Sequence, residues 1–257
     1  MKIIVPFDDR AEVEALGAIR SKAPFYYVSV KLDRTLFEKW NRKELPFILE
    51  GENRDFGKNW LYVDLVPSTC WYNNVRTIID DVDWERIKIM CKKRAGFRCE
   101  VCGSTPDFQA KNYLECHERY EYNPEDCTQK LVRFMCLCTR CHQSTHFGFA
   151  EVSGNRVGAK NHLMHINHWT SERAESHIAK RFAQWEEKSE IDWKADVTLL
   201  QTMEISIINQ FEAEYNTHVG CVNEQKCRKE HLIHGYTQSE IKEILDDLYS
   251  RAIPLST

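Results

Sequence analysis

The sequence of 257 residues contains no apolar run long enough to span a membrane. Its first residues, Met1 to Pro6, do not have the pattern of a secretory signal peptide. The formal net charge is −4, which argues against binding nucleic acid through bulk positive charge. No internal repeat or low-complexity linker interrupts the chain. We therefore expect a globular protein, and any nucleic-acid surface on it has to be local.

The composition is that of a chain that can bury a core. Apolar residues make up 42% and aromatic residues 11% of the sequence, which is enough for one to three domains. The sequence also contains 11 cysteines, which in a small secreted protein would indicate disulfides. This chain is long, lacks a signal pattern and has four cysteines at metal-binding spacing. We therefore expect reduced thiols and a cytoplasmic location.

Four cysteines form two closely spaced pairs, Cys99-x2-Cys102 and Cys138-x2-Cys141. Each pair can form a tight turn that offers two sulfur ligands, and two such turns complete a tetrahedral zinc shell. A closed shell of this kind stabilises a fold and performs no chemistry. The second pair continues directly into a His-x3-His stretch, which a purely structural zinc site does not need.

The sequence around these pairs resembles the HNH endonucleases, a family with a ββα-metal fold and an accessory zinc clamp. The resemblance is carried by LECHE at residues 114–118, LCTRCHQSTH at 137–146 and RAGFRCEVCG at 94–103. In that family a strand ends in a His-His or Asp-His pair, and a helix carries Cys-His-x3-His. The resemblance implies a metal-dependent endonuclease that hydrolyses phosphodiester bonds of nucleic acid. DNA is the expected substrate, and phage biology or anti-phage defence the expected setting.

Phosphodiester hydrolysis needs a nucleophilic water, a base that removes its proton and a cation that holds the scissile phosphate. His142 and His146 are four residues apart, so on a helix they share a face and can hold a cation such as Mg²⁺, Mn²⁺, Ni²⁺ or Zn²⁺. The strand before that helix has to supply the base and usually one ligand. The predicted catalytic residues are His117, Glu118 and His142.

Two alignments of the strand with the family are open. Matching Leu114 to the family's leucine puts His117 at the ligand position and Glu118 at the base position. Shifting by one residue puts Cys116 at the ligand position and His117 at the base position. Histidine suits the base because its pKa lies near neutrality, whereas the pKa of a glutamate has to be raised. His117 belongs to the site in both alignments.

The chain departs from the family at one position. The family commonly has Asn five residues before the third zinc cysteine, and this chain has Arg133 there. Gln129 is a candidate to take over the orienting role of that Asn. With Arg133 in place of that Asn, the nuclease activity that the resemblance implies could be changed or lost. The second hypothesis is therefore a non-catalytic adaptor that binds nucleic acid or protein and uses zinc only for folding.

A local basic cluster precedes the first cysteine pair. Its residues are Lys92, Lys93, Arg94 and Arg98. Next to a nuclease motif they are predicted to contact backbone phosphates. The alternative is a solvated helix face.

Residues 1–45 are predicted to form a small βαβ-like module. Strands are expected over residues 3–7 and 25–30, with a helix between them that Asp9 caps and that ends near Gly17. Together with FEKW at residues 37–40, this order resembles the module called DUF5710, which occurs on DNA-processing proteins of plasmids and phages. This module or the terminal helices are where a protein partner would bind, and the oligomeric state is open.

The rest of the chain is predicted as a connecting segment over residues 46–83, the nuclease domain over 84–160 and a helical region over 161–257. The fold class is therefore α+β, with a ββα-metal core. A strand is expected over residues 59–66. It contains part of a VDLVP stretch that, with the following Cys-Trp, resembles the lead-in of one bacterial group of HNH proteins.

Helices are expected over residues 84–95, capped by Asp83, and 172–185, capped by Thr170 or Ser171. A polar turn is expected over residues 151–160. His162, His165 and His168 lack zinc spacing and are read as a packed segment. A second zinc site is a candidate near the C-terminus, formed by Cys221, Cys227, His231 and His234. The remaining cysteines are expected to be buried thiols: Cys70, Cys91, Cys116, Cys127 and Cys136.

Overall fold

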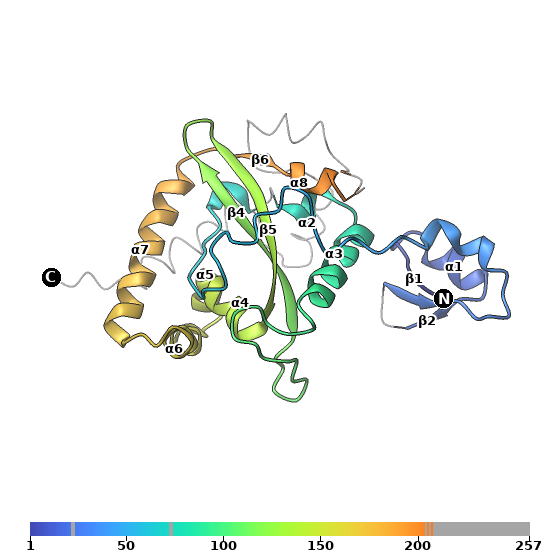
Figure 1. The fold of residues 1–257 in the computed structure, drawn as a ribbon, viewed down its shortest axis with the longest axis horizontal. Coiled ribbons are helices and arrows are strands. Elements are labelled where there is room, and N and C mark those ends of the chain that lie inside the picture. Colours follow the sequence, from blue (N-terminus) through green and yellow to red (C-terminus); the bar gives the residue numbers. More distant parts are fainter. Residues whose placement is uncertain (22–23, 72–73, 204, 206, 208–257) are drawn as a thin grey trace.

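The computed structural model describes residues 1–21, 24–71, 74–203, 205 and 207. These residues form a mixed α+β structure with two small sheets, and the predicted fold class is confirmed at that level (Figure 1). The predicted C-terminal zinc site at Cys221, Cys227, His231 and His234 lies outside the described residues. Within the described part of the chain, no helix is both long and apolar enough to cross a membrane.

The N-terminal module is a three-stranded antiparallel sheet in the order β1-β3-β2, with one helix. Its apolar side chains, among them Tyr26, Phe37 and Trp40, form a cluster of their own. This cluster is separate from the main core. The elements are β1 (Lys2–Ile4), α1 (Arg10–Ala15), β2 (Ile19–Arg20), β3 (Phe25–Tyr27) and a 3₁₀ segment (Arg34–Trp40).

The predicted order of strand, helix and aromatic strand is present in this module, with shorter elements than expected. Asp9 is the N-cap residue of α1, but its side chain makes no capping hydrogen bond. The carboxylate instead accepts a hydrogen bond of 2.7 Å from Nε1 of Trp40. Asp9 therefore fastens the end of the 3₁₀ segment to the start of α1.

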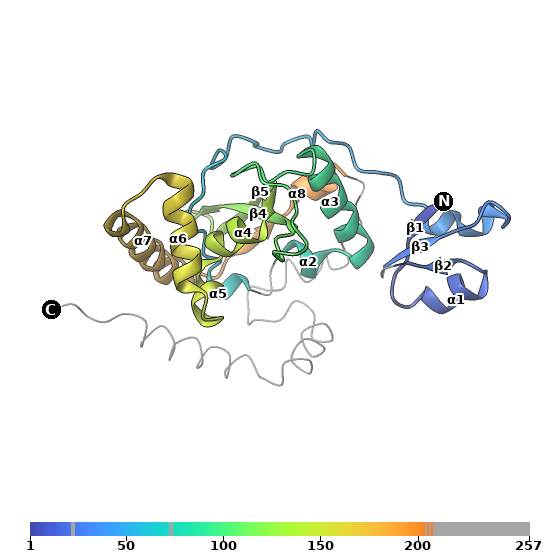
Figure 2. The same cartoon turned by 90° about the horizontal axis from the view of Figure 1, so that it is seen from below.

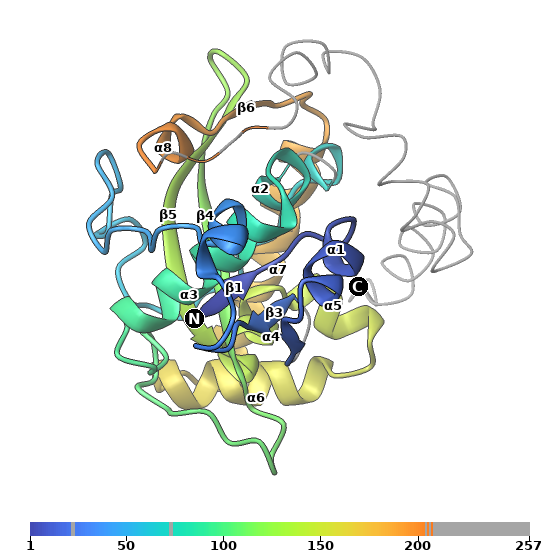
Figure 3. The same cartoon turned by 90° about the vertical axis from the view of Figure 1, so that its right-hand side faces the viewer.

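The main body is built around a long antiparallel hairpin of β4 (Leu114–Asn123) and β5 (Thr128–Cys138), followed at once by α4 (Thr139–Thr145). The hairpin register pairs Leu114 with Cys138, and an irregularity lies between Arg119 and Tyr120. A short parallel strand, β6 (Lys194–Asp196), adds to β5 near the hairpin turn, as the side view in Figure 3 shows. The order is strand, strand, helix.

Helices cover both faces of the hairpin. On one face lies α3 (Asp81–Arg94), where Cys91 is within hydrogen-bonding reach of Cys116 and Cys136. Residues of the opposite alternation, such as His117, face α4. Around α4 pack α5 (Phe147–Val152) and α6 (Arg156–Asn167), and α6 lies beside α7 (Ser171–Ser189) (Figure 2). Two short helices complete the set, α2 (Val75–Ile78) and α8 (Thr198–Gln201).

The predicted strand over residues 59–66 is wrong, because none of these residues belongs to a strand. The segment crosses the main body in an extended form and bonds to helices. The Asp64 amide donates to the carbonyl of Thr145 (2.9 Å), and the Val63 amide donates to Nε2 of His177 (3.1 Å). Alternation of apolar residues shows that a segment is extended, but it does not show whether a neighbouring strand is present.

Two helix boundaries also differ from the predictions. The cap of α3 is Asp80, whose side chain accepts from the Asp83 amide at 2.6 Å, whereas Asp83 is buried and pairs with Arg86. The expected polar turn over residues 151–160 is mostly helical, because α5 and α6 leave only residues 153–155 between them. The predicted cap Thr170 is confirmed: it accepts from the Arg173 amide, and α7 continues to Ser189.

In the described part of the chain, five cysteines lie outside the predicted zinc pairs, and all five are free thiols. Four of them are buried, as predicted: Cys70, Cys91, Cys116 and Cys136. The fifth, Cys127, is partly exposed near the hairpin turn.

Candidate metal centres

The two predicted cysteine pairs come together at the junction of β5 and α4. Their four sulfur atoms lie within 4.8 Å of one another, and the sulfurs of Cys102 and Cys138 are 3.7 Å apart. Cys138 ends β5 and is the N-cap residue of α4, and its sulfur accepts a hydrogen bond from the Cys141 amide. Gly103, with φ of +72°, closes the first turn by donating its amide to the carbonyl of Cys99.

The electrostatics of this cluster favour the thiolate at two of the four cysteines, Cys102 and Cys138, whereas hydrogen bonds with Cys102 raise the pKa values of Cys99 and Cys141. Hydrogen bonding to Cys138 raises the pKa of the Cys102 thiol, but hydrogen bonds from Cys141 and Cys99 outweigh it and lower that pKa to about 5. Hydrogen bonds from Cys102 and Cys141 also lower the pKa of Cys138. Four converging sulfurs, with some already inclined to ionise, suit a tetrahedral zinc ion, and its binding would stabilise the fold.

One histidine of the 162–168 stretch touches this cluster. Nε2 of His162, on α6, lies 3.2 Å from the sulfur of Cys141. Among the described residues, His162, His165 and His168 do not belong to a group of metal-ligand geometry. His162 is therefore placed as a hydrogen-bonding neighbour of a zinc ligand, a role that the sequence did not indicate.

A second cluster lies beside the first, formed by His117 on β4, His142 in α4 and His146 at the end of α4. One ring nitrogen from each residue lies within 4.8 Å of the other two. Nδ1 of His117 and Nε2 of His146 are 3.1 Å apart. The structure thus brings together the strand residue and both helix residues of the predicted nuclease motif.

These imidazoles are in the state that binds metal ions. Burial lowers the pKa of His117 well below its usual value, and the nearby His146 and His142 lower it further. Burial and His142 lower the pKa of His146 in the same way. Both rings are therefore neutral at pH 7, as a metal ligand has to be.

Glu115 orients the third histidine. Its carboxylate is 2.9 Å from Nδ1 of His142, and this hydrogen bond lowers the pKa of Glu115. The other ring nitrogen of His142, Nε2, is buried and has no hydrogen-bond partner among the described residues. A carboxylate on one nitrogen and a free second nitrogen is the arrangement of a histidine metal ligand. The cluster therefore fits a divalent cation with positions left for other ligands.

The histidine cluster opens into a cleft of about 590 Å³. His142, His146, Glu115 and Glu118 line this cleft, whereas His117 is 2% exposed and lies behind it. Oε1 of Glu118 lies 3.6 Å from Nε of Arg76, which also lines the cleft. Glu118, which is 7% exposed, is thus one of two motif carboxylates that line the cleft, and the other is the more exposed Glu115.

Asp64 is a residue that our sequence reasoning missed. Its carboxylate lies 4.0 Å from Nε2 of His117 and 3.4 Å from Nη1 of Arg119. Asp64 therefore approaches the far nitrogen of His117, opposite the one that faces His146. The available signal was the VDLVP stretch, whose resemblance to the lead-in of some HNH proteins pointed to this segment without giving it a role.

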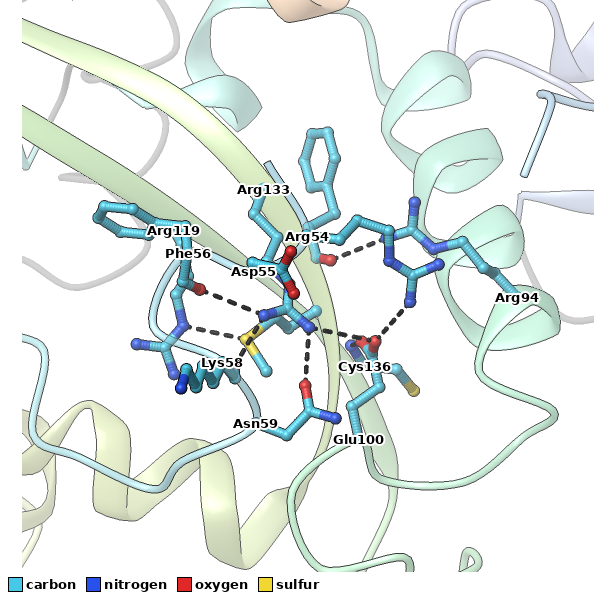
Figure 4. Close-up of polar contacts among 12 residues, drawn as sticks. Arg54, Asp55, Phe56, Lys58, Asn59, Arg94, Glu100, Arg119, Arg133 and Cys136 are labelled. Atoms are coloured by element: carbon cyan, nitrogen blue, oxygen red, sulfur yellow. Dashed lines mark hydrogen bonds and ion pairs between the residues drawn. The ribbon is translucent and has the colours of Figure 1, made fainter. Parts of the chain in front are cut away.

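Arg133 has a structural role on the hairpin (Figure 4). It is 1% exposed, and its guanidinium donates to the carbonyls of Phe56 (3.2 Å) and Lys58 (2.7 Å) and to Oδ1 of Asn59 (2.9 Å). It also pairs with Glu100 at 3.5 Å. Arg133 thereby fastens residues 56–59 to β5, at the start of the segment that delivers Asp64.

The hypothesis that Gln129 orients the site histidine is wrong. Gln129 pairs with Tyr122 in the hairpin, whereas His117 pairs with Met135. The two β4 positions are five residues apart, about 17 Å at 3.4 Å per residue. Gln129 is buried near the hairpin turn, so it cannot reach His117.

The predicted basic cluster is divided between the surface and the interior. The Arg94 side chain is 3% exposed and is held by both oxygens of Glu52 and by the carbonyl of Phe134. Lys93 pairs with Glu44, and exposed Arg98 donates to the carbonyl of Gly103. Arg94 is therefore occupied inside the fold. Phosphate contacts by Lys92, Lys93 and Arg98 stay a prediction.

Comparisons with protein-family models, with curated proteins and with solved structures find no match to this chain. Arguments about its chemistry therefore have to start from the two clusters themselves.

Proposed function

We propose that the chain is a metal-dependent endonuclease of the HNH type, acting on phosphodiester bonds of nucleic acid, with DNA as the expected substrate. The observation that carries the proposal is the three-histidine cluster. It sits at the junction of a strand, a strand and a helix, beside four cysteines suited to zinc, and it opens into a cleft. This order of elements agrees with a ββα-metal core.

In this proposal His117, His142 and His146 hold a divalent cation, and Cys99, Cys102, Cys138 and Cys141 hold a structural zinc ion. The bound cation would polarise the scissile phosphate and offset charge on the leaving oxygen. Glu115 keeps the His142 ring turned so that Nε2 faces the cluster. Asp64 approaches the opposite side of His117.

The geometry supports the alignment in which His117 is a ligand and Glu118 the base. A base has to reach a water molecule in the cleft, and Glu118 lines the cleft whereas His117 lies behind it. The shifted alignment would make Cys116 a ligand. Cys116 instead lies against Cys91 of α3 and, unlike Glu118, does not line the cleft.

The test is cleavage of supercoiled plasmid by purified zinc-containing protein with Mg²⁺ or Mn²⁺, compared with Glu118→Gln and His117→Ala. We expect Glu118→Gln to lose cleavage and keep the second, exchangeable ion. His117→Ala should lose both. His165→Gln, on an exposed face of α6, is the matched control and should cleave like the parent protein.

A different outcome would assign the roles differently. Full cleavage by Glu118→Gln, together with loss in His117→Ala, would make His117 the base. The alternative function is the non-catalytic adaptor, and the observation that favours it is Glu118 where the family has a histidine. A folded protein that binds DNA, holds one zinc and no exchangeable ion, and cleaves with neither metal would establish the adaptor.

A further inference from the structure

A second cavity, of about 680 Å³, lies next to the catalytic cleft. Its walls come from residues 56–64, the end of α6 and α7, and Tyr120 lines both the cavity and the cleft. Three cationic side chains and five large aromatic ones line it: Arg173, Arg181, Lys188, Phe56, Trp60, Tyr62, Tyr120 and Trp169.

The charge in this cavity is unbalanced. Among the residues that the structure describes, Asp64 is the one acidic residue that lines the cavity, and Arg119 already pairs with it. Within the described residues, Arg173, Arg181 and Lys188 form no ion pair with a carboxylate: Arg173 lies over the ring of Trp169, and Arg181 bonds to Gln184. His177 is neutral there, because burial lowers its pKa to about 4. A concentration of positive charge in a chain of net charge −4 indicates an anionic ligand.

A buried guanidinium adds an independent observation. Arg119 is 0% exposed and lies 3.9 Å above the ring of Tyr62, a lining residue. Its Nε donates to the sulfur of Met135, and its Nη1 faces Asp64, but its Nη2 is buried without a hydrogen-bond partner among the described residues. A buried charge with an unused donor is costly unless an anion approaches it.

The aromatic side chains give the cavity a flat apolar surface. Trp60 is 63% exposed, and the ring of Trp169 lies 4.9 Å from that of His177 at a tilt of 53°. An exposed indole beside guanidinium groups is a platform on which a nucleobase can stack while its phosphate meets the cations. The chemistry that combines a planar ring with an anion is that of a nucleotide.

We propose that this cavity is a nucleotide subsite, with the phosphate on Arg181, Lys188 and Arg173 and the base against Trp60 or Trp169. Its occupant is a unit of the same strand whose scissile phosphate enters the cleft, and in this respect the proposal rests on the proposed function. The shared wall supports a continuous path. Tyr120 borders both spaces, and α7 contributes Trp185 to the cleft and Arg181 to the cavity.

Binding of a short single-stranded oligodeoxynucleotide, followed by tryptophan fluorescence and calorimetry, tests this proposal. The zinc-containing full chain is used without added Mg²⁺ or Mn²⁺, so the readout does not depend on cleavage. We expect Arg181→Gln and Lys188→Gln each to weaken binding about tenfold and to reduce the salt dependence. Lys180→Gln, an exposed cation of the same helix outside the cavity, is the control and should bind within about twofold of the parent.

Two further probes identify the chemistry and the source of the ligand. Thymidine 5′-monophosphate should bind more weakly than the oligonucleotide and should be lost in the same variants, whereas inorganic phosphate should bind more weakly still. Lys188→Arg should keep binding, which separates a charge contact from a packing defect. These results would support the subsite even if the protein cleaves nothing.

Three results would overturn the proposal. Parent-like oligonucleotide affinity in Arg181→Gln and Lys188→Gln would place the strand elsewhere. Inorganic phosphate binding as tightly as the nucleotide would reduce the cavity to an anion site. A monophosphate that binds there while the variants leave oligonucleotide affinity unchanged would make the ligand a free nucleotide and not a strand unit.

Discussion

The two candidate metal-binding clusters of this chain share one short helix and differ in what surrounds them. Both take two ligands from the region of α4: Cys138 and Cys141 at its start, and His142 and His146 further on. The cysteine cluster offers four ligands and does not border the cleft, whereas the histidine cluster offers three and opens into it. Zinc sites in proteins divide along the same line, into closed structural sites and catalytic sites with an open position.

This comparison indicates that the helix is held in place by the first cluster so that it can present the second. The cysteines tie the start of α4 to the turn after α3, over residues far apart in the sequence. The histidines one turn later then meet His117 on β4. If this is correct, loss of a cysteine ligand should abolish both the fold of the main body and the binding of an ion by the histidines. Loss of a histidine should leave the fold intact.

The largest effect is expected from Cys138→Ser, which removes a sulfur ligand at the N-cap of α4. Structural zinc contributes roughly 10 kcal/mol or more in small zinc domains, so we expect loss of bound zinc and of cooperative unfolding in the main body. Metal analysis and thermal unfolding by circular dichroism measure both. Cys127→Ser, at a free and partly exposed thiol, should keep the zinc and the melting transition.

His146→Ala should separate the two clusters. Its expected effect is loss of the exchangeable ion and a fall in cleavage of roughly 10²- to 10⁴-fold, with the structural zinc still bound. The melting temperature should change by a few degrees at most, because three crowded neutral rings become two. Cleavage is measured on plasmid and the ion by competition with a fluorescent chelator. Loss of the structural zinc in this variant would contradict the separation of the clusters.

A finer test compares the polar neighbour of each cluster. Glu115→Gln removes the charge that orients His142, and we expect roughly tenfold weaker binding of the exchangeable ion without loss of zinc. His162→Gln removes the imidazole beside Cys141 and should weaken zinc retention by a similar factor, leaving the exchangeable ion in place. Each variant is the control for the other. A parallel loss of both ions in either variant would mean that the clusters are coupled.

The sequence predicted well which candidate ligands come together, because spacing along the chain decides it. Two Cys-x2-Cys pairs and a His-x3-His turn carry their own geometry, and the structure brings each of these groups together. The cap Thr170 and the α+β class followed from equally local signals.

Residues whose role depends on tertiary contacts could not be predicted. Asp64 reaches His117 because Arg133 fastens residues 56–59 to β5, a contact between positions more than 70 residues apart along the chain. Arg94 belongs to a basic run in the sequence, but in the fold it is buried and pairs with Glu52. The register of the β4–β5 hairpin places Gln129 far from His117, and the composition of the segment does not reveal that register. Charge and alternation alone do not show which partner a side chain finds.

The smallest expected effect concerns a histidine outside both clusters. His177 accepts the Val63 amide, and burial, followed by Arg181 and Lys180, lowers its pKa to about 4. Between the unfolded pKa of about 6.5 and that value, the unfolded chain binds a proton that the folded chain does not. The free energy of unfolding should therefore fall as the pH decreases through this window. Above the window, the contribution of His177 to stability is fully present.

Replacing this ring isolates its contribution from that of His117 and His146, whose lowered pKa values act in the same direction. His177→Gln keeps an acceptor for the Val63 amide. Between pH 7.5 and 5.5 its free energy of unfolding should fall by about 0.5–1 kcal/mol less than that of the parent protein, a figure that allows for the partial exposure of the ring. Urea unfolding at each pH, with zinc content checked, measures the difference. An unchanged pH slope would show that His177 is as readily protonated in the folded chain as in the unfolded one. His117 and His146 would then account for the slope on their own.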